Sequence, residues 1–179
     1  MSQLLSDAER EQQEHIILLK STRRKIKNQH IIVHNVFWAV WIGVIPSPLL
    51  DFLFMMAVQL KMISELSFEY NLKFSRNRGK AIITGIIGGS FTQLFAKSQI
   101  MKMIPGIGSL SGKIKMSIVA GAVTYAIGKV FERHLEAGGH LSNFDPEQSR
   151  DYFSQMYKQG EKLILRLPGN ERFNGNDEW

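Results

Sequence analysis

A glycine-rich run near the middle of the chain is the segment closest in residue type and spacing to a known catalytic motif. It reads Gly106-Ile107-Gly108-Ser109-Leu110-Ser111-Gly112-Lys113, and backbone amides in such runs can hold phosphate groups. The phosphate-binding loop of NTPases has four residues between its glycines and a Ser or Thr after its lysine. Here five residues separate Gly106 from Gly112, Ile114 follows the lysine, and no strand is expected before the run. We therefore interpret the run as the turn of a helical hairpin.

His30 and His34 are four residues apart, which is the spacing at which two imidazoles on one helical face can bind a metal ion. No third ligand is placed beside them and no HExxH pattern is formed, so an interfacial or core position is favoured. The carboxylates of Asp51, Glu65 and Glu69 could act as an acid or a base. Asp51 is explained by a helix start, and Glu65 and Glu69 by a solvated helix end. The sequence therefore predicts no enzyme, no cofactor and no metal site.

Three aromatic residues near the C-terminus, Tyr152, Phe153 and Tyr157, could stack on the bases of a nucleic acid. The net charge of +6 and the pI of about 9.6 suit any anionic partner, a lipid surface as well as nucleic acid. Helical spacing of aromatic residues more often marks a packing face or an interfacial helix. Nucleic acid is therefore the weaker interpretation.

The chain of 179 residues is long enough for one domain with a core of its own. It is 44% hydrophobic and 21% charged with a mean hydropathy of −0.09, which is too polar for a conventional multi-span transporter. It contains no cysteine, so disulfides, thiolate catalysis and cysteine-based zinc sites are excluded. The acidic segment 1–14 is the reverse of a secretory signal, and we therefore expect the protein not to be exported.

Apolar residues collect in four blocks. These blocks and the proline and glycine residues between them predict an all-α protein. The blocks are residues 31–45, 49–63, 81–96 and 116–131. The first two meet at Pro46-Ser47-Pro48, where Pro48 suits the first position of a helix. The last two are joined through Pro105-Gly106. We thus predict two tandem helical hairpins with proline and glycine tips, which together form a membrane-associated domain over residues 26–139.

Amphipathic helices are expected on both sides of the hairpins. The first covers residues 1–25 and includes a basic margin, and the second covers residues 140–169 with Asp145 as its cap and Pro146 at its first position. Both helices are expected to be free to bind a partner. Residues 170–179 are polar and are expected to be disordered.

Each apolar block is too short to cross a bilayer comfortably, because a helix rises ~1.5 Å per residue and the hydrocarbon core is ~30 Å thick. Hairpins that dip into one leaflet and leave their cationic flanks at the surface avoid burying lysine. The residues expected to insert are Phe37, Trp38, Trp41, Pro46, Pro48, Phe52, Phe54, Pro105 and Ile107. The residues expected to contact the anionic surface are Arg23, Arg24, Lys25, Lys27, Lys73, Arg76, Arg78 and Lys80.

Small residues within the blocks are expected to let helices approach closely. They are Gly85, Gly89, Ala120, Thr124 and Gly128. Such residues suit a soluble helical bundle equally well, with the apolar blocks as its core. The alternative to membrane docking is therefore a soluble all-helical interaction or oligomerisation protein.

Residues 36–139 resemble the YcjF-like family, a largely bacterial domain of unknown function. The likeness rests on Ile45-Pro46-Ser47-Pro48-Leu49-Leu50-Asp51, Gln59, Met62-Ile63, Tyr70, Ile104-Pro105-Gly106 and Thr124-Tyr125-Ala126-Ile127-Gly128. Asn71 departs from the pattern, because glycine is expected after Tyr70. Members of the family are described as membrane-associated and are found fused to or encoded near Era-like GTPases.

The resemblance and the residue patterns lead to one functional expectation. The chain is expected to be a non-catalytic accessory protein on the cytoplasmic side of a membrane, the inner membrane in a bacterium, with its hairpins docked in the cytoplasmic leaflet. Its expected partners are membrane lipids, a GTPase implied by the resemblance, and further copies of itself.

Overall fold

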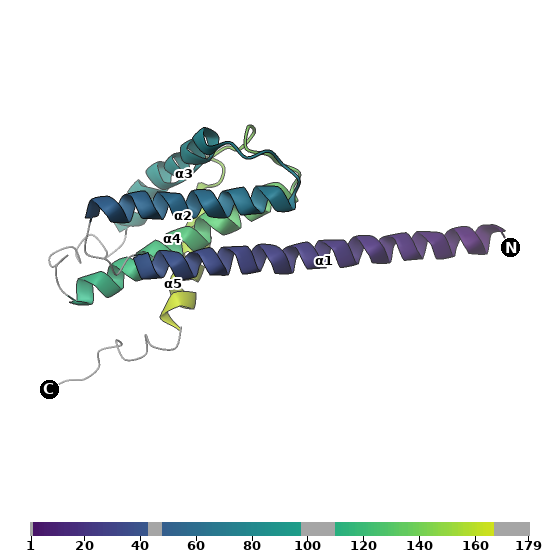
Figure 1. Ribbon diagram of the computed structural model, residues 1–179, viewed down its shortest axis with the longest axis horizontal. Helices are drawn as coiled ribbons and strands as arrows, with labels where there is room; N and C mark the ends of the chain where they lie inside the picture. The colour runs from purple at the N-terminus through teal and green to yellow at the C-terminus, as the bar shows by residue number, and fades with distance from the viewer. Residues whose placement is uncertain (1, 43–47, 98–109, 167–179) are drawn as a thin grey trace.

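The described part of the chain is helical, with no strand in residues 2–42, 48–97 and 110–166 of the computed structural model. Its helices are α1 (Ser2–Ile42), α2 (Pro48–Glu69), α3 (Arg76–Lys97), α4 (Leu110–Glu136) and α5 (Arg150–Leu165). The predicted all-α class is therefore confirmed, and α2 begins at Pro48 as the sequence predicts. Figure 1 shows α2, α3, α4 and α5 gathered beside the C-terminal half of α1.

Helix α1 runs without a break through the boundary that the sequence suggested between an N-terminal helix and the first apolar block. The physical reason is that Ser2–Ile42 contains neither glycine nor proline, and the lysines and arginines at the boundary are good helix formers. A change from polar to apolar composition does not end a helix by itself. The N-terminal half of α1 consequently projects well beyond the other helices (Figure 1).

The helices do not assemble as two independent hairpins. α1 and α2 are neighbours, as in the first predicted hairpin, and α4 lies against α1, α2 and α5. In the described backbone α3 has α2 and α5 as its main neighbours, so it does not run along α4 as a second hairpin arm would. The segment that leads into α5 occupies this place, since a Cβ on Gly85 of α3 would come within 2.8 Å of Pro146.

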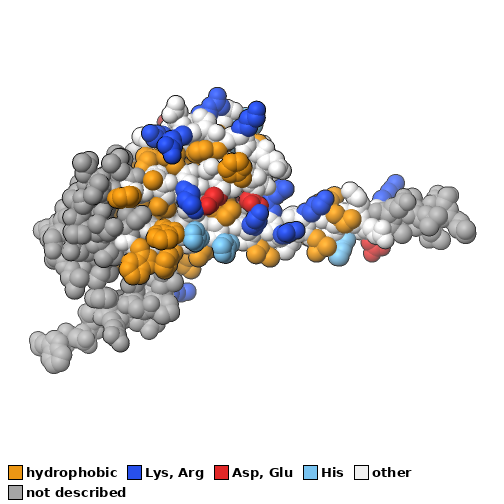
Figure 2. Space-filling view, viewed as in Figure 1, with side chains coloured by type: hydrophobic (Ala, Val, Ile, Leu, Met, Phe, Trp, Pro, Cys, Tyr) orange, Lys and Arg blue, Asp and Glu red, His pale blue; other side chains and the backbone are white. Residues whose placement is uncertain are grey.

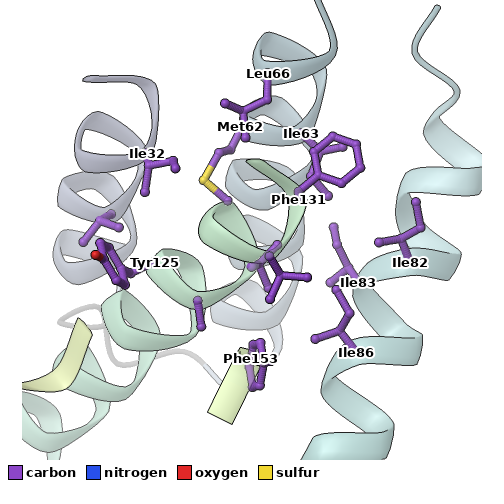
Figure 3. Close-up of a cluster of buried hydrophobic side chains, with 14 of the residues drawn as sticks. Ile32, Met62, Ile63, Leu66, Ile82, Ile83, Ile86, Tyr125, Phe131 and Phe153 are labelled. Carbon is purple, nitrogen blue, oxygen red and sulfur yellow. The ribbon is translucent and has the colours of Figure 1, made fainter. Parts of the chain in front are cut away.

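One apolar core joins all the helices. Figure 3 shows Ile32 of α1, Met62 of α2, Ile83 of α3, Phe131 of α4 and Phe153 of α5 directed into the same cluster, and all five side chains are buried. Burying an aliphatic or aromatic side chain of this size stabilises a fold by roughly 1.5–3 kcal/mol. The core therefore holds α3 and α5 in place although they are not arms of one hairpin.

The turn after α2 explains why a glycine was expected beside Tyr70. Asn71 has φ of 57°, which lies in the left-handed region. Glycine adopts this conformation without strain, and asparagine is one of the few other residues that tolerate it. The amide of Leu72 donates to the carbonyl of Ser67 and closes the helix end. Asn71 therefore performs the structural task of the expected glycine.

The C-terminal helix begins later than predicted and is not free. Asp145 caps a turn and not the helix: its Oδ1 accepts a hydrogen bond from the amide of Glu147 at 2.8 Å, residues 146–149 form turns, and α5 begins at Arg150 with Ser149 at its N-cap. Its apolar face is turned toward the bundle, and the residues buried there are Phe153, Tyr157, Gly160 and Ile164. The expectation that this helix is available to a partner through its apolar face is therefore wrong. Pro168, Gly169 and the tail 170–179 lie outside the described residues.

Candidate functional site

The most unusual surface feature is a group of aromatic side chains on α1 that no other described residue covers. Phe37, Trp38 and Trp41 are 56%, 50% and 60% exposed, and their rings lie in contact, with centroids 6.4 Å apart for Phe37–Trp38 and 6.1 Å for Phe37–Trp41. We call these three residues the aromatic patch. On the opposite side of the same stretch of α1, Val36 and Ala39 are buried in the core. This part of α1 is thus apolar on both sides, which is typical of a helix covered on both sides.

Two histidines border the aromatic patch. The rings of His30 and His34 are nearly parallel, with centroids 6.3 Å apart, and the indole N–H of Trp38 donates to Nε2 of His34 at 3.2 Å. Figure 2 shows histidine side chains beside a cluster of apolar ones on the visible face of the molecule. Within the described residues no group of three or more His, Asp or Glu is placed so that it could hold a metal ion. The polar rings of His30 and His34 therefore precede the apolar rings of the aromatic patch along α1.

The other residues expected to insert into lipid are located only in part. Phe54, near the start of α2, is 48% exposed. The side chains of Pro48 and Phe52 are not among those described, and Pro46, Pro105 and Ile107 lie in the two undescribed connections. The patch on α1 and Phe54 on α2 are therefore the parts of the predicted insertion surface that lie exposed among the described residues.

The basic residues predicted to contact an anionic surface are all exposed. Two of them also hold α1 to the end of α2: the guanidinium of Arg24 lies 4.8 Å from the ring centroid of Tyr70, and Lys27 Nζ lies 2.5 Å from Glu69 Oε1. Lys73 and Arg78, on the far side of that turn, line an open hollow of about 510 Å³. The two basic segments are thus brought to one end of the bundle, the end at which α2 finishes.

Three of the small residues predicted to allow close packing lie against partners that the sequence did not indicate. Gly128 lets α4 approach α1 and α2, since its Cβ would lie 2.8 Å from Ile32 and 3.0 Å from Met62. Ala120 and Thr124 are buried on the same helix. Gly85 and Gly89 of α3 face Pro146 and the guanidinium of Arg150 rather than a second hairpin arm.

Two further close-packed glycines, Gly121 and Gly160, were not among the residues predicted to allow close packing. A Cβ on Gly121 would meet Ile164 and Val40, and one on Gly160 would meet Tyr125. Gly121 and Gly128 are seven residues apart, and that spacing on one helical face was the signal that could have identified Gly121.

Glu65 and Glu69, two of the carboxylates considered for catalysis, have structural partners, and the side chain of Asp51 is not among those described. The carboxylate of Glu65 accepts hydrogen bonds from Nδ2 of Asn35 at 2.9 Å and from Nζ of Lys61 at 2.6 Å. Glu69 forms an ion pair with Lys27. These residues are therefore not simply a solvated helix end, as the sequence suggested, because they tie α2 to α1. The buried Asn35 was missed; its position one turn from Ile32 and Ala39 was the available signal.

Only the last part of the glycine-rich run lies within the described chain. Residues 106–109 lie outside the described chain, and Leu110–Lys113 form the first turn of α4. The preceding described element is helix α3 rather than the strand of a phosphate-binding loop.

The C-terminal aromatic residues are unsuited to base stacking. Phe153 and Tyr157 are buried, and Tyr152 lies under the guanidinium of Arg133.

Comparison with known proteins gives a family and a relative. Residues 6–162 match the domain of unknown function DUF697. Magnetosome membrane protein 22 of Magnetospirillum gryphiswaldense is 31% identical over 161 residues, which cover 88% of this chain and 83% of that protein. No solved structure matches the chain. None of the described helices is long and apolar enough to cross a membrane.

Proposed function

This chain belongs to the DUF697 family of domains of unknown function, and from that premise we propose that it is a membrane-associated, non-catalytic accessory protein docked on the cytoplasmic leaflet. The observation that carries the proposal is the aromatic patch, exposed on α1 directly behind the core-facing Val36 and Ala39. The name of the relative from Magnetospirillum gryphiswaldense, a magnetosome membrane protein, supports a membrane location.

The patch suits the interfacial region of a bilayer. Tryptophan is enriched there because its large ring is apolar while its N–H remains hydrogen-bonded. Here the Trp38 N–H already has an acceptor in His34, so the ring can enter the headgroup region without leaving an unpaired donor. A helix lying in the interface with one apolar side needs no span of about 20 residues.

Electrostatic attraction supports the same contact. Arg23 and Lys25 are exposed on α1, and a basic residue near an anionic membrane contributes about 1 kcal/mol of attraction. Because exposed charges are screened by salt, this part of the binding should weaken as ionic strength rises. The aromatic contribution should remain.

The proposal includes a GTPase partner, which rests on the resemblance to the YcjF-like family alone. Partner recognition would then be the accessory role of the protein at the membrane. Co-purification of a GTPase with the membrane-bound protein tests this part, and its failure would leave the lipid contact standing.

Vesicle flotation tests the docking itself. The double variant Phe37→Ser/Trp41→Ser should bind vesicles containing anionic lipid about tenfold or more weakly than the wild type, because two exposed aromatic side chains are lost from the contact. Phe68→Ser is the matched control, since Phe68 is 67% exposed on α2 but is not part of the patch. Circular dichroism should show unchanged helicity in all three proteins.

Equal flotation of the double variant and the wild type would overturn the docking proposal. A wild type that ignores vesicles and stays dispersed in plain buffer would favour the soluble interaction protein instead.

A further inference from the structure

The N-terminal half of α1 is a helix with nothing described around it. Every residue from 10 to 27 is exposed, and this stretch projects away from the bundle in Figure 1. The bundle begins near Arg24, whose guanidinium lies over Tyr70. An isolated helix is only marginally stable in water, because most helical stability in proteins comes from packing of an apolar face. We call residues 10–25 the overhang.

An apolar girdle encircles the middle of the overhang. Ile16, Ile17, Leu18 and Leu19 are consecutive and are 44%, 58%, 63% and 58% exposed. Since an α-helix has 3.6 residues per turn, four consecutive side chains point in all directions around it. Any partner that lies along the overhang therefore meets apolar side chains, whichever side of the helix it takes.

Charge divides the overhang on either side of the girdle. Glu11 and Glu14 precede it, whereas Lys20, Arg23 and Lys25 follow it, with Arg10 as the exception on the acidic side. In the described chain none of these five has a salt-bridge partner. The acidic residues make an anionic lipid surface a poor cover for the whole overhang, because they would be repelled by it.

A second copy of this chain running in the opposite direction fits the overhang. With Ile16 of one copy level with Leu19 of the other, the girdles coincide. Glu14 then lies within one residue of the level of Lys20, and Glu11 within one residue of the levels of Arg23 and Lys25. The same contacts occur twice, because an antiparallel pair of identical helices is related by a two-fold axis.

We propose that two copies of the protein associate through antiparallel pairing of their overhangs, with Ile16–Leu19 at the centre and the acidic part of each helix against the basic part of the other. A parallel pair places each glutamate level with its own copy, which is destabilising. The antiparallel arrangement also leaves the aromatic patch of each copy outside the paired centre.

The absence of cysteine makes the orientation measurable. Full-length Glu11→Cys and Lys25→Cys variants, carrying tags of different size, are mixed in mild detergent and treated with a short bismaleimide cross-linker. The mixed product, Glu11→Cys joined to Lys25→Cys, should predominate. Products that join each variant only to itself would show a parallel pair and overturn the proposal, and so would the absence of any cross-link.

Strength is tested separately by sedimentation of the full-length protein. Leu18→Lys should raise the dimer dissociation constant about tenfold or more, because it places two like charges at the centre of the pair. Phe68→Lys is the matched control, since Phe68 is as exposed as Leu18 but lies on α2. A wild type that is monomeric, or a Leu18→Lys dimer as tight as the control, would overturn the proposal.

Charge reversal provides a rescue that a merely structural effect would not show. Glu11→Lys/Glu14→Lys and Lys20→Glu/Arg23→Glu should each dissociate, because each double variant places like charges opposite one another in the antiparallel pair. Mixing the two variants should restore a dimer, now of two different chains. Failure of the mixture to associate would contradict charge complementarity as the basis of pairing.

Discussion

Tyr157 is a buried phenol whose environment makes alkaline pH destabilising. Its hydroxyl has no hydrogen-bond partner among the described residues, and burial raises its pKa to about 12, with a smaller contribution from Glu161. The unfolded chain has a pKa of about 10 for tyrosine, so the unfolded state loses this proton first as pH rises. Stability linked to Tyr157 is therefore complete below pH ~10 and is lost progressively as the pH approaches 12.

Tyr157→Phe should separate the two effects of this hydroxyl. At pH 7 the variant should be about 1 kcal/mol more stable, because a buried group without a partner is removed. Between pH 10 and 12 it should lose less stability than the wild type, by up to about 2 kcal/mol. Some alkaline loss should remain, since burial also raises the pKa of Tyr70 and Tyr125. Urea unfolding across this pH range measures both, and a variant less stable at pH 7 would indicate a hydrogen bond to the hydroxyl.

Some properties of single residues could be predicted from the sequence and others could not. The exposure of Trp38 and Trp41 could be predicted, because aromatic rings between basic and proline-rich segments are typical of an interface. The bond from Asn35 to Glu65 could not, since it depends on which residues of α1 and α2 lie at the same level. Sequence spacing within one helix carries no information on that cross-helix register.

Gly128 of α4 and Gly88 of α3 should respond oppositely to the same substitution. Gly128→Ala should destabilise the protein by about 1–3 kcal/mol, because the new Cβ would lie 2.8 Å from Ile32 and 3.0 Å from Met62. Gly88→Ala is the matched control: nothing lies within 4 Å of its Cβ position, and alanine is the better helix former. It should stabilise by about 0.5–1 kcal/mol. Thermal unfolding of both variants checks the pair, and equal effects would mean that α4 does not approach α1 as closely as described.

Element boundaries followed local chemistry, whereas element neighbours did not. Pro48 marks the start of α2 as predicted, because it acts through adjacent backbone groups, whereas Asp145 caps only the turn that precedes α5. Gly85 was recognised as a contact position, yet its partner proved to be Pro146 rather than a hairpin arm. Small residues show that something approaches a helix closely but do not identify it.

At the scale of the whole molecule, the described parts of the four apolar blocks lie within α1, α2, α3 and α4. They did not indicate that α3 would pack on α2 and α5, because a single core shared by all helices buries more apolar surface than two separate pairs. Nor did they show that α1 would continue as one helix away from the bundle. The result is a bundle that carries the aromatic patch and an overhang that projects from it (Figure 1).

This division of the molecule predicts the outcome of removing residues 1–19. Residues 10–19 are exposed and lie before the stretch of α1 that reaches Tyr70, so the bundle should keep its free energy of unfolding to within about 0.5 kcal/mol. The comparison is made by urea unfolding at concentrations at which the wild type is monomeric, because dimerisation adds stability by mass action. The shortened protein should still bind vesicles through the aromatic patch and should no longer self-associate. A loss of several kcal/mol would instead mean that the overhang folds back on the bundle in solution, and the girdle would then be covered by its own chain rather than by a second copy.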